Sequence, residues 1–388
     1  MRAAPVLSSR GFVLRIALAA VWAVIVSTLF LQAANGLQTD VIGLAANARG
    51  FGPAVTGLMM AAYYVGYSAA PLAGRRIVAR FGHVAVIIVC AAAAAAVIAV
   101  QPFIVTAPVW AGLRAVSGFA LSLTNIGYES WLNDRVPTLQ RGRVFSVYVF
   151  AQMIGLTGAQ CLLATGRAPT APLFLSAAGL FAIAAVPVAA ARRTAPHGVP
   201  PAPLGIVALF RTSPLGAGAT LLAGLAWAIM FTFGPIYARR TGLSVPDVAL
   251  FMALAMAAGC VLQIPLGWLS DIVGRKPMIV GMFAIGLVAS LFGIWAGGHG
   301  QIVKFLAISV VGGFTFPIYA VSVAQVNDHL SSDTRVAAAA GLVLLFGIGS
   351  FFGPLLCGAL LGAVGPGGFY LLLAVTTAVG AGLAAARR

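Results

Sequence analysis

Long apolar segments separated by short polar turns leave this chain few folds to adopt. Residues 84–101, for example, contain no Asp, Glu, Lys or Arg. Over the whole chain 61% of the residues are hydrophobic and 8% are charged, whereas a soluble domain carries about 25% charged residues. No stretch is long and polar enough for a separate soluble domain. We therefore interpret the chain as an integral membrane protein.

The apolar segments have the length of membrane-spanning helices, which need about 20 residues to cross the hydrocarbon core. Backbone amides at membrane depth must be paired within their own segment, so the segments are expected to be helical. A closed β-barrel is excluded because the segments are too long and lack a two-residue alternation. The twelve predicted spans are residues 12–37, 53–73, 84–101, 106–131, 144–164, 171–190, 216–237, 248–266, 277–296, 303–326, 337–361 and 367–386.

The basic residues are distributed unevenly between the two sides of these spans. Of the 23 Lys and Arg residues, seventeen fall on the side that would hold both termini, five on the other, and Arg114 inside a span. This asymmetry places both termini in the cytoplasm. Although the net charge is +16, the basic residues form no continuous face, which argues against a nucleic-acid partner. Arg outnumbers Lys 21 to 2, which is typical of a GC-rich bacterial genome and indicates the bacterial inner membrane.

A proline-rich stretch at residues 192–205, RRTAPHGVPPAPLG, divides the chain near its middle. We predict an N-terminal six-helix bundle at 1–191, a cytoplasmic linker at 192–215 and a C-terminal six-helix bundle at 216–388. Short motifs recur between the halves: NDR at 133–135 matches NDH at 327–329, an offset of 194. Similar offsets at separate places indicate a duplicated unit, so the fold is predicted to be an all-α membrane protein with twelve helices in two pseudo-symmetric six-helix bundles.

One decapeptide, GWLSDIVGRK at residues 267–276, places Asp271, Arg275 and Lys276 between two long apolar segments. Such a charged turn is typical of a short cytoplasmic loop. The pattern G-x-L-x-D-x-x-G-R-K resembles the loop signature of the major facilitator superfamily of transporters, which occurs once in each half of those proteins. A degenerate copy, RRIVARFGHV, lies at 75–84.

Residues 127–148, GYESWLNDRVPTLQRGRVFSVY, are similar to the YcaD-like branch of bacterial transporters in that superfamily. The resemblance implies transport by alternating access, in which two helical bundles rock about a substrate site near the bilayer midplane. It also implies that the first, fourth, seventh and tenth spans line the substrate cavity.

Polar or aromatic residues recur at helical spacing in those four spans. Polar faces in membrane helices avoid lipid, and two interpretations are open: helix–helix hydrogen bonds or a hydrated substrate cavity. The cavity is favoured because the stripes fall on the four spans that the resemblance indicates. The predicted cavity residues are Gln32, Asn35, Arg114, Asn125, Trp227, Phe231 and Tyr319.

Arg114 is the one basic residue well inside a span, where a charge is costly and therefore a candidate for function. With Gly118 it forms R-x-x-x-G, which resembles a fourth-helix motif linked to proton coupling in drug antiporters. The alternatives are that Arg114 extends to the outer interface or stabilises buried carbonyl groups.

Glu129 lies fifteen residues after Arg114, about 22 Å along a helix, which is too far for a direct ion pair. We expect it near the inner mouth beside Asp134 and residues 141–143. It would either lock the inner gate through ion pairs or carry a proton. Asp40, at the outer end of the first span, is expected to be solvated.

The loop motif has a candidate role in gating. Asp271 can accept hydrogen bonds from backbone amides at a helix N-terminus, where the helix dipole favours an anion. The resemblance implies that this helix is 144–164, in the other half. Gly267 and Gly274 allow close approach and turning. In the degenerate copy Ala79 replaces the acid, so the two halves are expected to close unequally.

The two basic residues that end the motif, Arg275 and Lys276, can pair with Asp328 or Asp333 at the end of the tenth span. The alternative interpretation of the motif is that its charges only set membrane topology.

No metal, cofactor or enzymatic activity is predicted. The four cysteines lie in apolar segments without the spacing of a metal or redox site, and no phosphate-binding loop indicates ATP use. We predict a secondary active transporter that moves a small organic solute and works as a monomer in the lipid bilayer. Coupling to protons is favoured, and facilitated transport is the alternative. The alternative is a transporter-like sensor or scaffold without transport.

Overall fold

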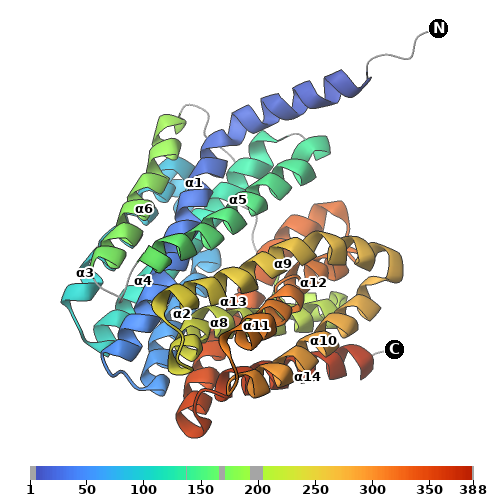
Figure 1. Ribbon diagram of the computed structural model, residues 1–388. Helices are drawn as coiled ribbons and strands as arrows, with labels where there is room; N and C mark the ends of the chain where they lie inside the picture. The colour runs from blue at the N-terminus through green and yellow to red at the C-terminus, as the bar shows by residue number, and fades with distance from the viewer. Residues whose placement is uncertain (1–5, 137, 166–170, 193–203, 387–388) are drawn as a thin grey trace.

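The computed structural model describes residues 6–136, 138–165, 171–192 and 204–386; the side chains of 6–20, 138–143, 332, 333, 336 and 386 lie outside that description. The described residues form helices and no strand (Figure 1). The helices are α1 (Val6–Ala48), α2 (Pro53–Phe81), α3 (His83–Val100), the short 3-10 helix η1 (Gln101–Phe103), α4 (Ala107–Arg135), α5 (Thr138–Thr165), α6 (Ala171–Ala190), α7 (Ile206–Thr212), α8 (Pro214–Arg240), α9 (Val245–Val273), α10 (Arg275–Ala296), α11 (Gln301–Thr315), α12 (Ile318–Asn327), α13 (Ser332–Val364) and α14 (Gly368–Ala386).

In the described part of the chain, ten segments are long and apolar enough to cross a membrane. α2 and α4 are 29 residues long but are not among the ten. These two helices carry tyrosine and charged residues that contribute to the site described below.

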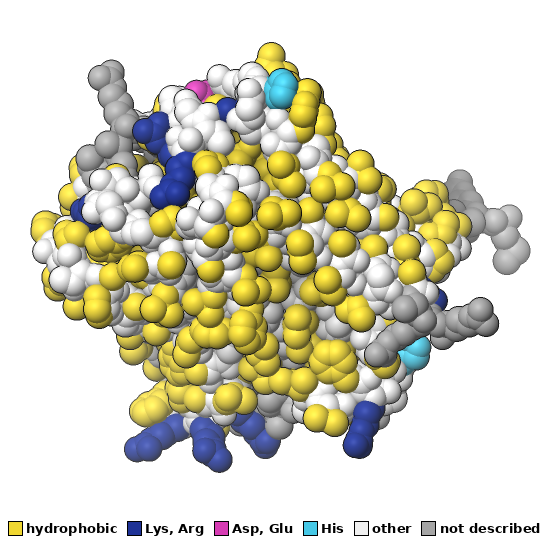
Figure 2. Space-filling model, turned by 90° about the horizontal axis from the view of Figure 1, so that it is seen from below, with side chains coloured by type: hydrophobic (Ala, Val, Ile, Leu, Met, Phe, Trp, Pro, Cys, Tyr) yellow, Lys and Arg dark blue, Asp and Glu magenta, His cyan; other side chains and the backbone are white. Residues whose placement is uncertain are grey.

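An apolar surface surrounds the bundle, as a membrane protein requires. Ile264 on α9 is 80% exposed and Phe103 of η1 is 72% exposed. Figure 2 shows apolar side chains across the whole face in view, with Lys and Arg side chains gathered at two opposite edges.

The first predicted span ends too early. We expected it to end at residue 37, whereas α1 continues to Ala48. Gln38 and Asp40, which the prediction placed outside the span, are 0% and 1% exposed. Polar partners on neighbouring helices, invisible in a hydropathy pattern, explain why these residues are inside the bundle.

The predicted span 303–326 is interrupted in the structure. It consists of α11 and α12, which are separated at Phe316 and Pro317. Proline has no backbone N–H to donate and its ring collides with the preceding turn, so it breaks a helix at this point. The break directs the Phe316 ring into a cluster of aromatic residues.

The helices before and after the proline-rich stretch pack mainly among themselves (Figure 1). In the first half, α1 packs on α5 and α6, and α2 on α4; in the second, α8 packs on α13, and α10 on α14. The halves meet along three helix pairs, which are α2 with α13, α5 with α9, and α1 with α8. A side chain on these pairs therefore lies near the boundary between the halves.

The second part of the predicted linker is folded. Leu209 of α7 is fully buried in a cluster with Leu342 and Leu345 of α13, and the Leu204 amide donates to the Ala337 carbonyl at 2.7 Å. This segment is thus fixed to the second half, while residues 193–203 of the predicted linker lie outside the described residues.

Turns with a left-handed glycine occur at matching positions in the two halves. Gly82 (φ 76°) and Gly274 (φ 93°) end α2 and α9, and Gly50 (φ 77°) and Gly242 (φ 91°) form the turns that precede those helices. Both pairs are separated by 192 positions. Because positive φ favours glycine, these positions are consistent with a duplicated backbone. We call the end of the bundle with Gly82 and Gly274 the basic end, and the end with Gly50 and Gly242 the opposite end.

Candidate functional site

A chain of polar contacts joins α1, α2 and α4 inside the first half. The Asn35 amide donates to Gln32 Oε1 at 3.4 Å, and the Tyr63 hydroxyl donates to Asn35 Oδ1 at 3.4 Å. The guanidinium carbon of Arg114 lies 4.4 Å from the centre of the Tyr63 ring. The structure therefore brings together three predicted cavity residues, Gln32, Asn35 and Arg114, through a tyrosine that the sequence analysis missed.

A second group surrounds Glu129, near the boundary between the halves. Its carboxyl group lies within electrostatic range of the hydroxyl groups of Tyr67 on α2, Tyr148 on α5 and Tyr319 on α12. No ion pair between Glu129 and a described basic side chain is present. Tyr67 also stacks on Tyr63, with ring centres 5.9 Å apart, so the two groups are continuous.

A cluster of aromatic rings continues from Tyr319 into the second half. Tyr319 contacts Phe346 (5.0 Å between ring centres), which contacts Trp227 (5.8 Å). Trp227 lies 4.8 Å from Phe316 and 5.5 Å from Phe231. We call the connected series from Gln32 to Phe231 the central tract.

Members of the central tract come from α1, α2, α4, α5, α8 and α13 and from the interrupted helix pair α11–α12. Gln32, Asn35, Glu129, Trp227 and Tyr319 are half-buried. Asn125 lies one turn before Glu129 on α4, and its Oδ1 is buried without a partner. The predicted cavity residues are thus found in one connected region or one helical turn from it.

Five residues of the central tract escaped the sequence analysis: Tyr63, Tyr67, Tyr148, Phe316 and Phe346. The first two stand in the run YYVGY at 63–67, four residues apart and hence on one helical face. This spacing in the sequence could have identified Tyr63 and Tyr67 as one face of a helix. The others are apolar-looking positions in apolar helices, and no pattern distinguishes them from lipid-facing residues.

The expectation that Asp40 is solvated is wrong. Its side chain is 1% exposed, and Gln160 Nε2 on α5 donates to its Oδ2 at 2.7 Å. Asp40 Oδ1 and Gln160 Oε1 are buried without a partner. The first half therefore contains a fully buried carboxyl group, Asp40, besides the half-buried Glu129.

The environment predicted for Glu129 is present only in part. Asp134 pairs with its neighbour Arg135 at 3.6 Å rather than with a residue near Glu129. The side chains of Arg141 and Arg143 lie outside the described residues, so an ion-pair network involving them stays a prediction.

The loop motif at the basic end forms a compact charged group within the second half. Arg275 pairs with Asp271 at 2.5 Å and with Asp328 at 3.2 Å, and it donates to Ser270 at 2.5 Å. The predicted pair between Arg275 and Asp328 is confirmed, while the side chain of Asp333 lies outside the described residues.

The predicted contact between Asp271 and the helix at 144–164, now α5, does not occur among the described residues. Asp271 is 59% exposed on its side chain and binds Arg275 instead. At the basic end no hydrogen bond or ion pair between described residues joins the halves. The side chains of 138–143, at the start of α5, lie outside the described residues, so a contact with them stays a prediction.

At the opposite end the halves are in close contact. The Nε of Arg240 on α8 donates to Asn47 Oδ1 on α1 at 3.0 Å. A Cβ at Gly358 on α13 would lie 3.1 Å from the Gly57 Cα on α2. Val245 and Ala249 of α9 belong to the same buried apolar cluster as the first half. This conformation is therefore closed at the opposite end.

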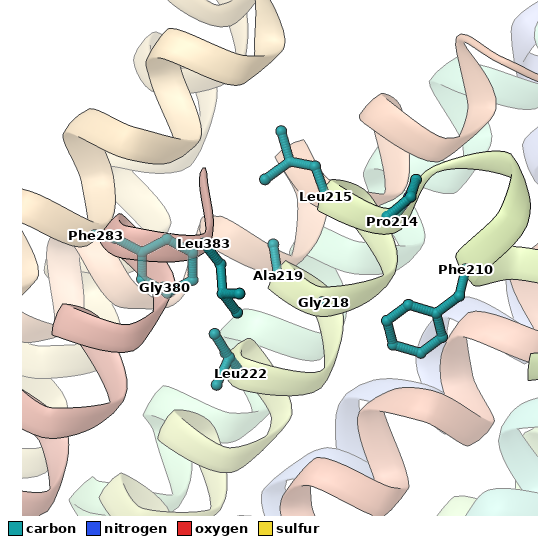
Figure 3. A pocket seen from close by; sticks show the side chains of 9 residues that line it. All are labelled: Phe210, Pro214, Leu215, Gly218, Ala219, Leu222, Phe283, Gly380 and Leu383. Carbon is teal, nitrogen blue, oxygen red and sulfur yellow. The ribbon is translucent and has the colours of Figure 1, made fainter. Parts of the chain in front are cut away.

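The cavity in Figure 3 lies away from the central tract. It has a volume of about 70 Å³ and is lined by Phe210, Pro214, Leu215, Gly218, Ala219, Leu222, Phe283, Gly380 and Leu383. Ligand sites usually measure about 300–1,000 Å³, and this lining offers no polar side chain. We interpret the cavity as a packing gap between α7, α8, α10 and α14.

The apolar outer surface, the helical bundle and the polar tract between its halves define a multi-pass helical membrane protein. Its sequence identifies the family more closely: residues 11–297 and 216–388 match the model of the Major Facilitator Superfamily. The chain belongs to this family.

Relatives in bacteria are similar over part of the chain. An uncharacterized MFS-type transporter of Yersinia pestis (strain Pestoides F) is 25% identical over 250 residues, which is 63% of this chain and 63% of that protein. The uncharacterized MFS-type transporter YcaD of Escherichia fergusonii matches with the same identity and coverage. The matched stretch is thus less than two thirds of each relative, and the relatives are transporters rather than enzymes.

Solved structures share the fold. A variant of the nucleoside transporter NupG has a TM-score of 0.78 at 15% identity and covers 95% of this chain and 99% of its own. A bacterial homolog of the human lysosomal transporter Spinster has a TM-score of 0.80 at 15% identity, with 95% of each chain covered. At this identity the likeness establishes the fold alone.

Proposed function

We propose that this protein is a secondary transporter that moves a small organic solute across the bacterial inner membrane by alternating access. Both termini lie on the side of the basic end, which carries more positive charge than the opposite end and therefore faces the cytoplasm. α2 and α4 cross the membrane together with the ten apolar segments, which gives twelve spans in two six-helix halves. The central tract is the observation that carries this proposal.

The placement of the central tract supports a substrate pathway. Charged residues inside a membrane span are costly and are usually placed where a substrate or ion passes. Here Glu129 lies near hydroxyl groups of both halves, and Arg114 is connected to this group through Tyr63 and Tyr67 of the first half. A boundary that opens alternately at its two ends would expose these groups to each side in turn.

Coupling to protons is assigned to Glu129. Its carboxyl group interacts with hydroxyl groups from both halves, because Tyr67 and Tyr148 belong to the first half and Tyr319 to the second. A movement of one half against the other changes this environment. Protonation of Glu129 is therefore sensitive to which end of the boundary is open.

Gating at the basic end is assigned to the loop motif, with Gly267 inside α9, Gly274 at the turn after α9, and Asp271, Arg275 and Lys276 as its charged residues. When the basic end closes, Asp271 exchanges Arg275 for the N-terminus of α5. The conformation that is closed at the opposite end is then the inward-open state of the cycle.

The experiment is uptake into proteoliposomes over a panel of metabolites, with and without an imposed proton gradient. We expect at least one solute to accumulate only with the gradient, and Glu129→Gln to abolish accumulation while exchange across the membrane persists. Absence of flux for every solute would instead favour the alternative, a transporter-like sensor or scaffold.

A further inference from the structure

Arg114 is a buried cation without an anionic partner. Its side chain is 2% exposed, and its Nε and Nη1 atoms are buried without a hydrogen-bond acceptor. The groups that interact with it electrostatically are the uncharged side chains of Tyr63 and Tyr64. None of the carboxylates among the described residues forms an ion pair with it.

A guanidinium group carries five N–H donors in a planar fork and remains charged in proteins. Contact with the Tyr63 ring at 4.4 Å offsets part of the cost of burial. Ring contact leaves the in-plane donors unused, however, and unpaired buried donors are destabilising. The missing component is an oxyanion that accepts from the edge of the guanidinium group.

The neighbouring polar groups are bonded to one another, so Arg114 itself supplies the unpaired donors of the site. Tyr63 connects Arg114 to the Asn35 and Gln32 amides through contacts of 3.4 Å. The site holds one positive charge and no second basic side chain among the described residues, so it matches a monoanion. A carboxylate fits this charge better than a phosphate group, which carries nearly two negative charges at neutral pH.

The other end of the central tract is apolar and aromatic. Trp227 contacts the rings of Phe231, Phe316 and Phe346, and its indole N–H is buried without a partner. Tyr63 and Tyr67 stack between the two ends. A solute held by its anionic group at Arg114 would present its remaining atoms to aromatic rings.

We propose that the substrate is an organic monocarboxylate with an aromatic body, whose carboxylate group binds Arg114. This inference rests on the proposed transport function, because it names the solute class of the same site. The rings of Tyr63 and Tyr67, which adjoin Arg114, contact the aromatic body, and the aromatic cluster around Trp227 lies beyond them.

The test is calorimetric titration of the purified full-length protein with arylacetates, each compared with its uncharged amide and with an aryl phosphate. Phenylacetate, phenylacetamide and benzyl phosphate form the first set. We expect at least one arylacetate to bind about tenfold or more tighter than its matched amide, since hydrogen bonds to a charged group are the stronger ones. Equal binding of acid and amide, tighter binding of the phosphate, or no binding throughout would overturn the proposal.

Variants of Arg114 test whether its positive charge produces the preference for the acid. Arg114→Gln should remove the preference for acid over amide, and Arg114→Lys should retain part of it, because lysine keeps the charge but not the fork. Arg49→Gln is the matched control: Arg49 also lies over an aromatic ring, Trp110 at 5.0 Å, but is exposed.

The comparison of acid with amide in the unmodified protein remains decisive if Arg114→Gln fails to fold. Proton-dependent flux of neutral solutes without carboxylate binding would defeat this inference alone, whereas absence of all flux would defeat the proposed function.

Discussion

Arg240 on α8 donates a hydrogen bond from its Nε to Oδ1 of Asn47 on α1, at 3.0 Å. The two residues belong to different halves of the chain and lie at the opposite end of the bundle. Their contact can persist only while that end is closed. It is therefore a specific element of the gate that closes when the basic end is open.

Removing this contact should favour opening of the opposite end. A single hydrogen bond contributes about 0.5–1.5 kcal/mol, which changes the ratio of the two conformations by about 2- to 10-fold. We expect Asn47→Ala and Arg240→Gln to increase the long-distance population between spin labels at Ala54 and Ala363, two exposed positions at that end. Arg239→Gln is the control, because Arg239 donates to the Leu243 carbonyl within its own half. Equal effects of all three variants would contradict the proposal that the hydrogen bond between Arg240 and Asn47 holds this end closed.

The buried pair of Asp40 and Gln160 should stabilise the first half. Gln160→Ala leaves a buried carboxyl group without its donor and is expected to cost about 1–3 kcal/mol. The measurement is the thermal unfolding midpoint in detergent. Gln301→Ala is a matched control, since Gln301 also donates to an aspartate, Asp247 at 2.6 Å, but at an exposed site. If Gln160→Ala lowers the unfolding midpoint no more than Gln301→Ala does, burial of the Asp40–Gln160 pair does not contribute to stability.

Asp271 should act on the closed state of the basic end. In the conformation described here it binds Arg275, whereas closure would let it reach the α5 N-terminus. That contact is worth about 0.3–1 kcal/mol when exposed and up to about 2 kcal/mol when partly buried, so Asp271→Asn should raise the inward-open population, by about thirtyfold at most. Ala79→Asp should have a smaller effect or favour closure. Spin-label distances between Arg76 and Thr334 measure this, and unchanged distributions together with intact transport in Asp271→Asn would reduce the motif to a topology signal.

Orientation is tested by thiol labelling from outside the cell. In a background without the four native cysteines, His299→Cys should react and Arg76→Cys should not. Both positions are exposed, Arg76 in the last two turns of α2 and His299 in the bend after α10, unlike Ser270, which is 1% exposed and binds Arg275. The reverse pattern would place the termini outside.

The helical class and the family followed from features that lie in the sequence itself. Apolar segments of membrane length predicted the helices, and the motif at 267–276 predicted the family. The helical spacing of Gln32 and Asn35 identified one face of α1 because the 3.6-residue period puts both on the same side. The pairing of Arg275 with Asp328 was predictable because charged residues at the ends of adjacent spans share one membrane surface.

Other features depended on partners that are distant in sequence. Asp40 looked solvated because its donor, Gln160, lies 120 residues away. Tyr148 and Phe346 are indistinguishable from lipid-facing residues until their helices are packed. The hydropathy pattern also gave no indication that Pro317 would divide one span into two helices, because proline in a membrane helix can also be accommodated by a kink.

The most direct test of alternating access locks the gate at the opposite end. Asn47→Cys and Arg240→Cys are combined in the cysteine-free protein and joined by a cleavable bifunctional thiol reagent, and uptake of a transported solute into proteoliposomes is then measured. The account predicts that the link abolishes uptake and that cleavage restores it, while each single cysteine treated in the same way transports normally. Undiminished uptake with the link intact would contradict the account, because a solute could then cross without opening of that end.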